Sequence, residues 1–212
     1  MTQRILETSD RLFYHQGIRA VGVDMIAAEA GISKRSLYDY FASKDDLIVA
    51  YLTHRARRNA ASEAPAVDQI LGVFDWLERW FDSGTFRGCP FVNAVTELGD
   101  PKHPASVLAA TYKRERRAWA RQMLSELDVA DADGLATQIM ILIDGAMATM
   151  LVHGDPKVAR AAKAAARSLL LGAGVPVSAV AAKPPSATRR KTARDEVPRS
   201  TGKKQTREAG RT

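Results

Sequence analysis

The sequence contains one cysteine, Cys89, so a disulfide bond within a single chain is excluded. It has no run of about 18 apolar residues, and we therefore expect no membrane-spanning helix and no membrane partner. The first residues form an amphipathic pattern with charges at Arg4 and Glu7, rather than a signal peptide. Together these absences predict a protein of the reducing cytoplasm.

The motifs that accompany most enzyme chemistry are missing as well. The sequence has no glycine-rich phosphate-binding loop, no paired His or Cys residues at metal-ligand spacing and no glycine-flanked nucleophile. The histidines are scattered, and we interpret each as a surface or packing residue: His15, His54, His103 and His153. We therefore expect no enzymatic activity, no cofactor and no metal site.

Two short helical patterns in residues 22–41 flank Gly31. The first has one apolar stripe at helical spacing, formed by Val23, Ile26, Ala27 and Ala30. Gly31 follows directly and suits the end of a helix, because glycine adopts left-handed conformations without steric cost. Ser33 then stands where the next helix needs an N-cap. Such a turn between two short helices is typical of a helix-turn-helix.

The second pattern, Lys34 to Tyr40, is only about two turns long. Leu37 and Phe41 lie four residues apart and are expected to face inward, while Lys34 and Arg35 face outward. Two cations on the outer face of so short a helix favour insertion into the DNA major groove. An ordinary pair of solvated cations is the alternative.

Flanking patterns extend this unit to a domain of residues 1–55. An apolar stripe between residues 3 and 15 ends at Gly17. Ser43 to Asp46 has the form of a capping box, which opens a further helix that continues to Leu52. Lys44, in the first turn of that helix, lies beside free backbone amides, which is a suitable place to hold a phosphate.

Residues 4–52 resemble the N-terminal DNA-binding domain of the TetR family of bacterial transcriptional regulators. The residues that match at fixed spacings are Ile5-Leu6, Leu12-Phe13, Gly17, Val23, Ile26-Ala27, Ala30-Gly31-Ile32-Ser33, Leu37-Tyr38, Phe41, Lys44 and Leu47. The resemblance implies contacts to base edges from Lys34, Arg35 and Ser36, and contacts to phosphates from Tyr38, Tyr40 and Lys44. Gly22 departs from the family, which often has Ser or Thr at this position.

Several of these side chains have an alternative role. Tyr38 and Tyr40 are compatible with partly buried rings whose hydroxyl groups meet water. Arg35 and Asp39 lie four residues apart, and they either pair on the helix surface or leave Asp39 to accept a hydrogen bond from a cytosine amine. The sequence alone does not decide between these roles.

Residues 56–174 have the pattern of a helical body, with helices expected at 67–81, 90–98, 104–127, 133–153 and 156–171. The fourth is apolar on almost every side, so we expect it to be buried all round. The predicted fold class is all-α: an N-terminal three-helix domain with the helix-turn-helix, followed by a C-terminal helical bundle for ligand binding and dimerisation.

The last segment, residues 175–212, differs from the rest in composition. It contains ten Lys or Arg against three Asp or Glu, which accounts for the whole net charge of +7. It has no aromatic residue and is rich in Ala, Pro, Ser and Thr, so we expect a disordered basic tail. Such a tail either attracts DNA without regard to sequence or simply keeps the protein soluble.

The resemblance covers residues 3–172, because FRGCPFVNAVTEL and LIDGAMATM look like segments of many TetR-type regulators. It implies a homodimer formed through the last two helices of the body, which reads a pseudo-palindromic operator in double-stranded DNA. It also implies that a small-molecule effector in the body shifts the separation of the two reading helices. A monomeric bundle centred on the apolar helix is the alternative.

Candidate effector-binding residues are the polar, aromatic and sulfur-containing side chains of these apolar helices: Trp76, Trp80, Cys89, Phe91, Asn93, Tyr112, Trp119, Met140, Asp144 and Met147. For each aromatic and methionine, plain core packing is the alternative. Asp144 needs a partner, which is a cation of the long charged helix, a residue of a second subunit or a cationic ligand. Cys89 is either an inert buried thiol or a sensor of electrophiles.

The sequence therefore predicts a sequence-specific, ligand-responsive transcriptional regulator, and more specifically a repressor that an effector releases from its operator. The alternative is a protein that binds DNA without specificity through its cationic tail.

Overall fold

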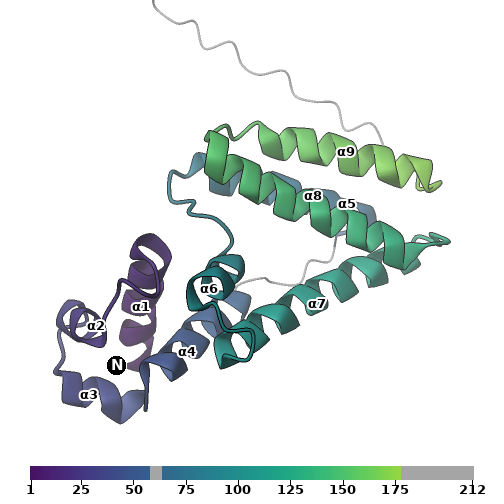
Figure 1. Ribbon diagram of the computed structural model, residues 1–212. Helices are drawn as coiled ribbons and strands as arrows, with labels where there is room; N and C mark the ends of the chain where they lie inside the picture. Colours follow the sequence, from purple (N-terminus) through teal and green to yellow (C-terminus); the bar gives the residue numbers. More distant parts are fainter. Residues whose placement is uncertain (58–63, 178–212) are drawn as a thin grey trace, which may run out of the picture. The chain divides into compact units, whose positions relative to one another are not determined.

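The computed structural model describes residues 1–57 and 64–177, and these residues form helices and no strands (Figure 1). The helices are α1 (Thr2–Gln16), α2 (Val23–Glu29), α3 (Lys34–Tyr40), α4 (Lys44–Arg57), α5 (Ala66–Asp82), α6 (Pro90–Leu98), α7 (Pro104–Ser125), α8 (Ala132–His153) and α9 (Val158–Gly172). The expected all-α fold is confirmed.

Helices α1 to α4 pack around a small apolar core. The expected stripes point inward, so that Leu12 of α1, Ile26 of α2, Leu37 of α3 and Leu47 of α4 are each at most 1% exposed. Leu37 is the buried residue of α3, so this short helix is held on the domain by one side and leaves the opposite side to solvent. Burial of one large aliphatic side chain contributes roughly 1.5–3 kcal/mol.

The turn between α2 and α3 has the expected construction. Gly31 adopts a left-handed conformation with φ of 64°, and the Ile32 backbone N–H donates to the Ala27 carbonyl at 3.0 Å. The Ser33 hydroxyl then accepts a hydrogen bond from the Ser36 backbone N–H at 3.0 Å, as an N-cap does. Gly22 caps α2 with no side-chain hydrogen bond, as its lack of a hydroxyl requires.

Ser43 caps the start of α4, as expected, but the Asp46 carboxylate bonds to the Ser43 hydroxyl rather than to its backbone N–H as in a full capping box. The Ser43 hydroxyl accepts from the Asp46 backbone N–H at 3.0 Å and donates to the Asp46 carboxylate at 2.7 Å. In the next position, the Lys44 ammonium donates to the Ile18 carbonyl at 2.7 Å and so ties α4 to the loop between α1 and α2.

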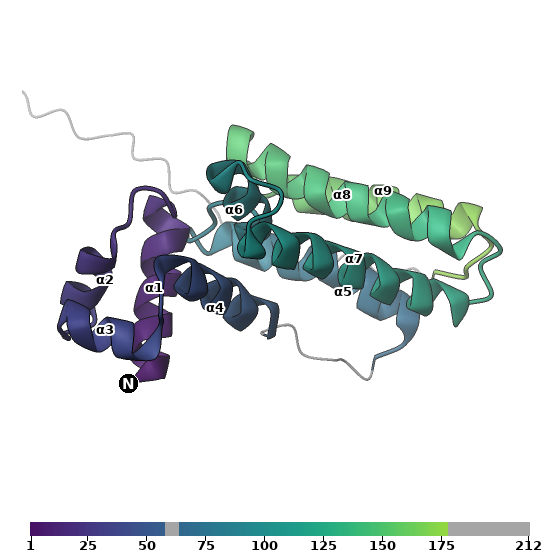
Figure 2. The same ribbon diagram turned by 60° about the horizontal axis from the view of Figure 1, so that its bottom comes forward.

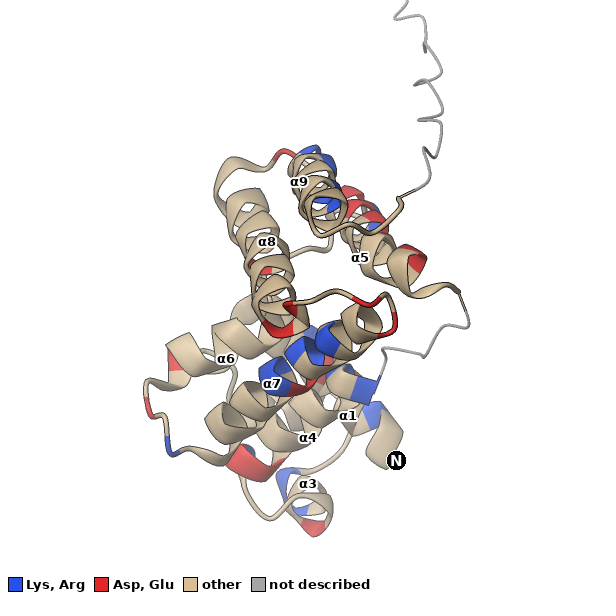
Figure 3. Ribbon diagram, turned by 90° about the vertical axis from the view of Figure 1, so that its right-hand side faces the viewer, with Lys and Arg blue, Asp and Glu red and all other residues tan. Residues whose placement is uncertain are grey.

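Helices α5 to α9 form the body, and α4 packs against α7 (Figure 2). In the two ribbon views α8 and α9 run side by side, and α9 also contacts α5. Two ion pairs connect α9 to α5, one between Arg160 and Glu78 and one between Lys163 and Asp75 at 2.6 Å. Figure 3 shows Lys and Arg on α9, Asp and Glu on α5, and a band of Lys and Arg along α7.

In the body, two helix boundaries differ from expectation by two residues, and the others by at most one. Helix α9 begins at Val158 rather than at Pro156, because the preceding turn is closed by hydrogen bonds between residues three apart, from the Val158 N–H to the Asp155 carbonyl and from the Ala159 N–H to the Pro156 carbonyl, each at 3.2 Å. Helix α7 ends at Ser125 rather than Leu127, and the following Asp128 has a left-handed φ of 55°. These are end effects that leave each helix on its predicted segment.

The single chain does not bury α8 all round, in contrast to our expectation. Ile141 is 64% exposed and Val152 is 78% exposed, although Ile139 on the opposite side is fully buried. Helix α8 also has the length and composition of a membrane-spanning helix, which the criterion of an unbroken apolar run missed. A core helix of a soluble protein passes the same test, and here α8 packs against α7 and α9.

The packed part of the chain extends a little beyond its expected end. Val175 is 2% exposed, and the Arg167 guanidinium donates to the Val177 carbonyl at 3.0 Å. Residues 175–177 therefore belong to the helical body, because they cover the end of α9. The remainder of the expected tail, residues 178–212, lies outside the described residues.

We expect Gly31→Ala to destabilise the protein by about 1–2 kcal/mol, since an added Cβ meets nothing but the left-handed backbone disfavours it. The control is Gly72→Ala within α5, which also has open space and lacks a positive φ. That substitution should stabilise by about 0.5–1 kcal/mol. Urea unfolding measures both, and equal effects of the two would contradict the assignment of the turn.

Candidate DNA-binding surface and ligand cavity

The outer side of α3 carries an exposed group of polar and aromatic side chains. Lys34, Arg35 and Asp39 are exposed, and Ser36 is half-buried beside the Ser33 cap. Tyr38 and Tyr40 are 42% and 48% exposed, which leaves each ring partly covered and still accessible to a partner. The helix thus presents hydrogen-bond donors outward, and its buried side keeps them in a fixed orientation.

Salt bridges on this face are few. Lys34 pairs with Asp24 of α2 at 3.0 Å, and this hydrogen bond raises the pKa of the Lys34 ammonium. Both side chains are exposed, so the pair contributes little to stability and leaves Lys34 accessible. Among the described residues Arg35 and Asp39 form no ion pair, and their alternative role as a surface pair is therefore not supported.

Lys44 has a different environment from the one expected. We placed its ammonium beside free amides at the start of α4, yet it is part-buried and donates to the Ile18 carbonyl. An ammonium has three N–H groups, so the contact takes one of them and restricts the others. Lys44 therefore holds the loop after α1 in place, and any contact to a phosphate must come from its remaining N–H groups.

The body contains a large cavity of about 1140 Å³. Most of the candidate effector-binding residues line it: Trp76, Trp80, Cys89, Phe91, Tyr112, Trp119, Met140 and Met147. Aromatic rings contact one another along its wall, with 4.9 Å between the ring centroids of Trp76 and Trp80. The rings of Phe91 and Tyr112 stack at 3.7 Å with an interplanar angle of 10°. This surface suits flat apolar molecules.

Two candidates lie outside the cavity wall. The Asn93 amide donates to the Arg87 carbonyl at 2.8 Å and so fixes the loop before α6. Asp144 pairs with Lys113 of α7, which is the first of the three partners that the sequence left open. Its carboxylate is thereby compensated within the chain, because a charge on so apolar a helix requires a partner.

Three residues of the cavity wall come from the N-terminal domain, namely Tyr14, His15 and Arg55, and no sequence pattern pointed to them. The Tyr14 hydroxyl accepts from the Arg87 backbone N–H at 2.8 Å and donates to the Gly88 carbonyl at 2.9 Å. The Arg55 guanidinium lies 3.9 Å from the centroid of the Tyr14 ring and forms a bidentate pair with Asp10. Burial raises the pKa of the Tyr14 hydroxyl, which therefore stays protonated as a donor.

Comparison with known proteins identifies the family of this chain and its functional class. Residues 5–51 match the family model of the bacterial regulatory proteins of the tetR family, and residues 66–165 match that of the LmrA/YxaF-like C-terminal domain of transcriptional regulators. A TetR-type regulator from Streptomyces avermitilis is 31% identical, with a TM-score of 0.73 over 82% of this chain and 98% of its own. The chain belongs to the TetR family. It is a transcriptional regulator with a helix-turn-helix DNA-binding domain.

Further relatives of this TetR-family chain agree with that assignment. A TetR-family regulator from Streptomyces coelicolor is also 31% identical, with a TM-score of 0.71 over 81% of this chain and 95% of its own. The HTH-type transcriptional regulator YjdC of Escherichia coli is 24% identical over 157 residues, which cover 70% of this chain and 82% of that protein. Similarity therefore spans both the DNA-binding domain and the body.

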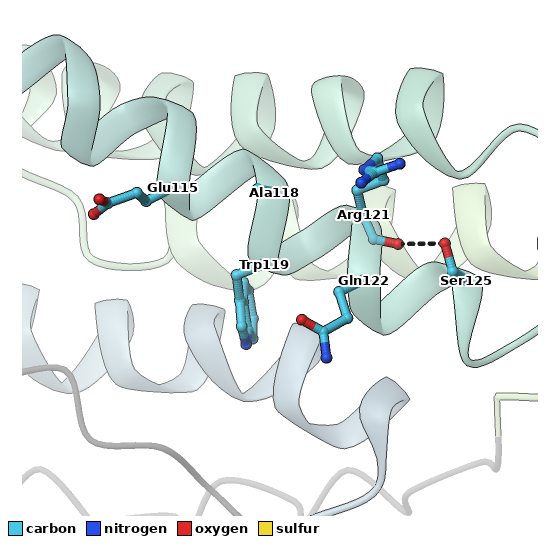
Figure 4. Close-up of a pocket in the computed structure, with 6 residues that line it drawn as sticks. All are labelled: Glu115, Ala118, Trp119, Arg121, Gln122 and Ser125. Atoms are coloured by element: carbon cyan, nitrogen blue, oxygen red, sulfur yellow. Dashed lines mark hydrogen bonds between the residues drawn. The ribbon is translucent and has the colours of Figure 1, made fainter.

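Helix α7 of this TetR-family chain also has a shallower surface hollow of about 580 Å³. Its six lining residues all lie on α7, and Trp119 and Gln122 line the large cavity as well. Figure 4 shows these two side chains pointing to one side of the helix and Arg121 to the other. The hollow is thus an extension of the cavity along one helix.

Two of the histidines, His103 and His15, have defined contacts in the fold. His103 caps α7, since its Nδ1 accepts from the Ala105 backbone N–H at 3.1 Å. Its Nε2 lies 3.4 Å from the Asp45 carboxylate in the first turn of α4, so it connects the DNA-binding domain to the body. His15 lines the large cavity. Cys89, at 9% exposure, lines it too.

We expect Arg55→Met to destabilise the protein by about 2–3 kcal/mol, because it leaves the Asp10 carboxylate without its partner at a site where the two side chains are 14% and 16% exposed. The double substitution with Asp10→Asn should lose less than the sum of the two single effects. Lys34→Met is the control, since its pair with Asp24 is exposed, and it should leave the urea midpoint unchanged. Additive effects at Arg55 and Asp10 would refute the coupling.

Proposed function

We propose that this protein is a sequence-specific repressor in the cytoplasm, which a small molecule bound in the large cavity releases from its operator. One observation carries the proposal: the cavity wall includes Tyr14 of α1 and Arg55 of α4 together with side chains of α5, α7 and α8. A molecule bound there contacts the domain that carries the reading helix, so its binding free energy can depend on the position of that domain.

The reading function rests on the exposed side of α3. Lys34, Arg35 and Ser36 lie in its first turn, where recognition helices contact base edges, and Arg suits the paired acceptors of guanine. The exposed hydroxyls of Tyr38 and Tyr40 supply donors for phosphates. Asp39 is exposed and remains our candidate acceptor for a cytosine amine.

The exposed side of α8 and α9 supports a homodimer through these two helices. On α8 one stripe of exposed residues follows alternating spacings of three and four: Gln138, Ile141, Gly145, Ala148 and Val152. On α9 small residues are exposed, namely Ala161, Ala164, Ala165 and Ser168. An uncharged face of this kind with small side chains allows two helix pairs to approach closely. A two-fold dimer then places two copies of α3 on two half-sites.

We expect Arg35→Ala to weaken binding to the DNA upstream of the protein's own gene about ten- to hundredfold. The variant should also discriminate less well between this DNA and a duplex of random sequence. Tyr38→Phe removes one phosphate donor and should weaken binding to both duplexes by a similar, smaller factor. Fluorescence anisotropy at two salt concentrations measures both effects. Arg114→Ala is the control, because it removes the same charge from an exposed position of α7.

The same titration tests binding driven by the tail. A chain that ends after Val177 should keep its preference for the upstream site, although its affinity for any duplex can fall at low salt. Loss of all binding on truncation, together with no effect of Arg35→Ala, would contradict sequence-specific recognition by α3.

We expect Ile141→Glu to convert the dimer to a monomer, since it places a charge in the centre of the apolar face. Val107→Glu is the control, because Val107 is 50% exposed on α7, outside this face. Sedimentation velocity measures the oligomeric state, and circular dichroism confirms that each variant is folded. A monomeric wild type, or a dimer that tolerates Ile141→Glu, would contradict the proposed interface.

A further inference from the structure

We propose that the ligand of the large cavity is an aromatic anion, a flat apolar molecule with a single carboxylate or similar acidic group that Arg116 binds. This inference rests on the proposed function only in taking the cavity as the effector site. It adds the chemical class of the ligand and the residue that selects it.

The charges of the cavity wall are unequal in sign. The described Lys and Arg side chains that line the cavity are Arg55, Arg79, Lys113 and Arg116, whereas Asp68 is the one carboxylate among the described lining residues. Arg55 and Lys113 are each compensated by a carboxylate that lies outside the wall, Asp10 and Asp144 respectively. Arg79 and Asp68 are exposed. Arg116 is therefore the half-buried cation whose charge the described residues leave uncompensated.

The geometry of Arg116 prepares it for an acidic group. Its guanidinium carbon lies 4.5 Å from the centroid of the Trp119 ring, and this stacking holds the plane of the group. Among the described residues Arg116 forms no ion pair and donates no hydrogen bond, so its N–H edges remain available. A fixed planar guanidinium with free edges matches a carboxylate in two parallel hydrogen bonds.

The remainder of the wall selects the apolar part of the ligand. Trp119 lies beside Arg116, and Trp76, Trp80 and the stacked pair of Phe91 and Tyr112 line the same space. Flat rings bind such surfaces through offset or edge contacts. A cationic ligand is disfavoured, because it would meet the uncompensated charge of Arg116 without a compensating carboxylate.

The three tryptophans of the sequence all line the cavity, so their fluorescence reports its occupancy directly. Three probes with one ring system separate charge from shape: 2-anthracenecarboxylate, the neutral 2-anthracenecarboxamide and the cationic 2-(aminomethyl)anthracene. Titration of the full chain, followed by energy transfer from tryptophan to anthracene, gives a dissociation constant for each probe.

We expect the carboxylate to bind at least about tenfold more tightly than the amide, and the ammonium probe to bind more weakly than either. Arg116→Gln keeps a planar polar group on Trp119, and it should lower the carboxylate affinity to that of the amide while leaving the amide affinity unchanged. Arg116→Lys keeps the charge without the fork and should retain only part of the preference. Arg114→Gln, an exposed neighbour outside the wall, should behave as wild type.

Equal affinities of the carboxylate and the amide in the wild type would overturn the inference, as would a preference that survives Arg116→Gln or an absence of energy transfer with every probe. Release from the upstream DNA is measured separately. Selective binding of the carboxylate without any effect on DNA affinity would contradict the proposed ligand response and support the assignment of the ligand class.

Discussion

The contact of Arg55 with Asp10 and Tyr14 is the interaction on which the arrangement of the N-terminal domain depends. It joins α4 to α1 at a position where both charged side chains are largely buried. A guanidinium in such a place must be compensated, so the pair restricts the two helices to one relative position. Because α2 is packed on α1 and α3 on α2, the orientation of the reading helix follows from this contact.

Local signals in the sequence were sufficient for most of the helices. Gly31 and Ser33 specify the turn before α3 through backbone conformation and one hydrogen bond, and both act within a few residues. The same holds for the Ser43 cap. Lys44 shows the limit, since its partner is the Ile18 carbonyl, 26 residues away in the sequence. The identity of a side chain says which groups it can bind, and the tertiary fold decides which one it reaches.

The cavity was predictable in its apolar part and not in its polar part. Aromatic and sulfur-containing residues at helical spacing in the body pointed to its wall, because apolar helices must face one another. Tyr14 and Arg55 belong to another domain, and the Tyr14 hydroxyl meets Gly88 across 74 residues. Asp144 was recognised as a carboxylate that needs a partner, and only the packing of α7 on α8 selects Lys113.

Helix α8 has more apolar residues than its own chain can bury. Its apolar residues are more numerous than the contacts of α7 and α9 can cover, so Ile141 and Val152 remain exposed. The proposed second subunit resolves this excess, because it covers the face that its own chain leaves open. In the proposed dimer, this uncovered face is the part of the chain that lies on the two-fold axis.

The energetics of the proposed response require only a small rearrangement. A tenfold to hundredfold change in DNA affinity corresponds to a coupling of about 1.4–2.7 kcal/mol between the two sites. A net hydrogen bond to a charged group contributes about 1.5–3 kcal/mol, so altering one contact of Arg55 is sufficient in magnitude. The exposed pair of Lys34 and Asp24 is too weakly coupled to the fold to serve in this way. By reciprocity, operator DNA must weaken the binding of such a ligand by the same factor, so the cavity of the DNA-bound protein is the poorer binding site.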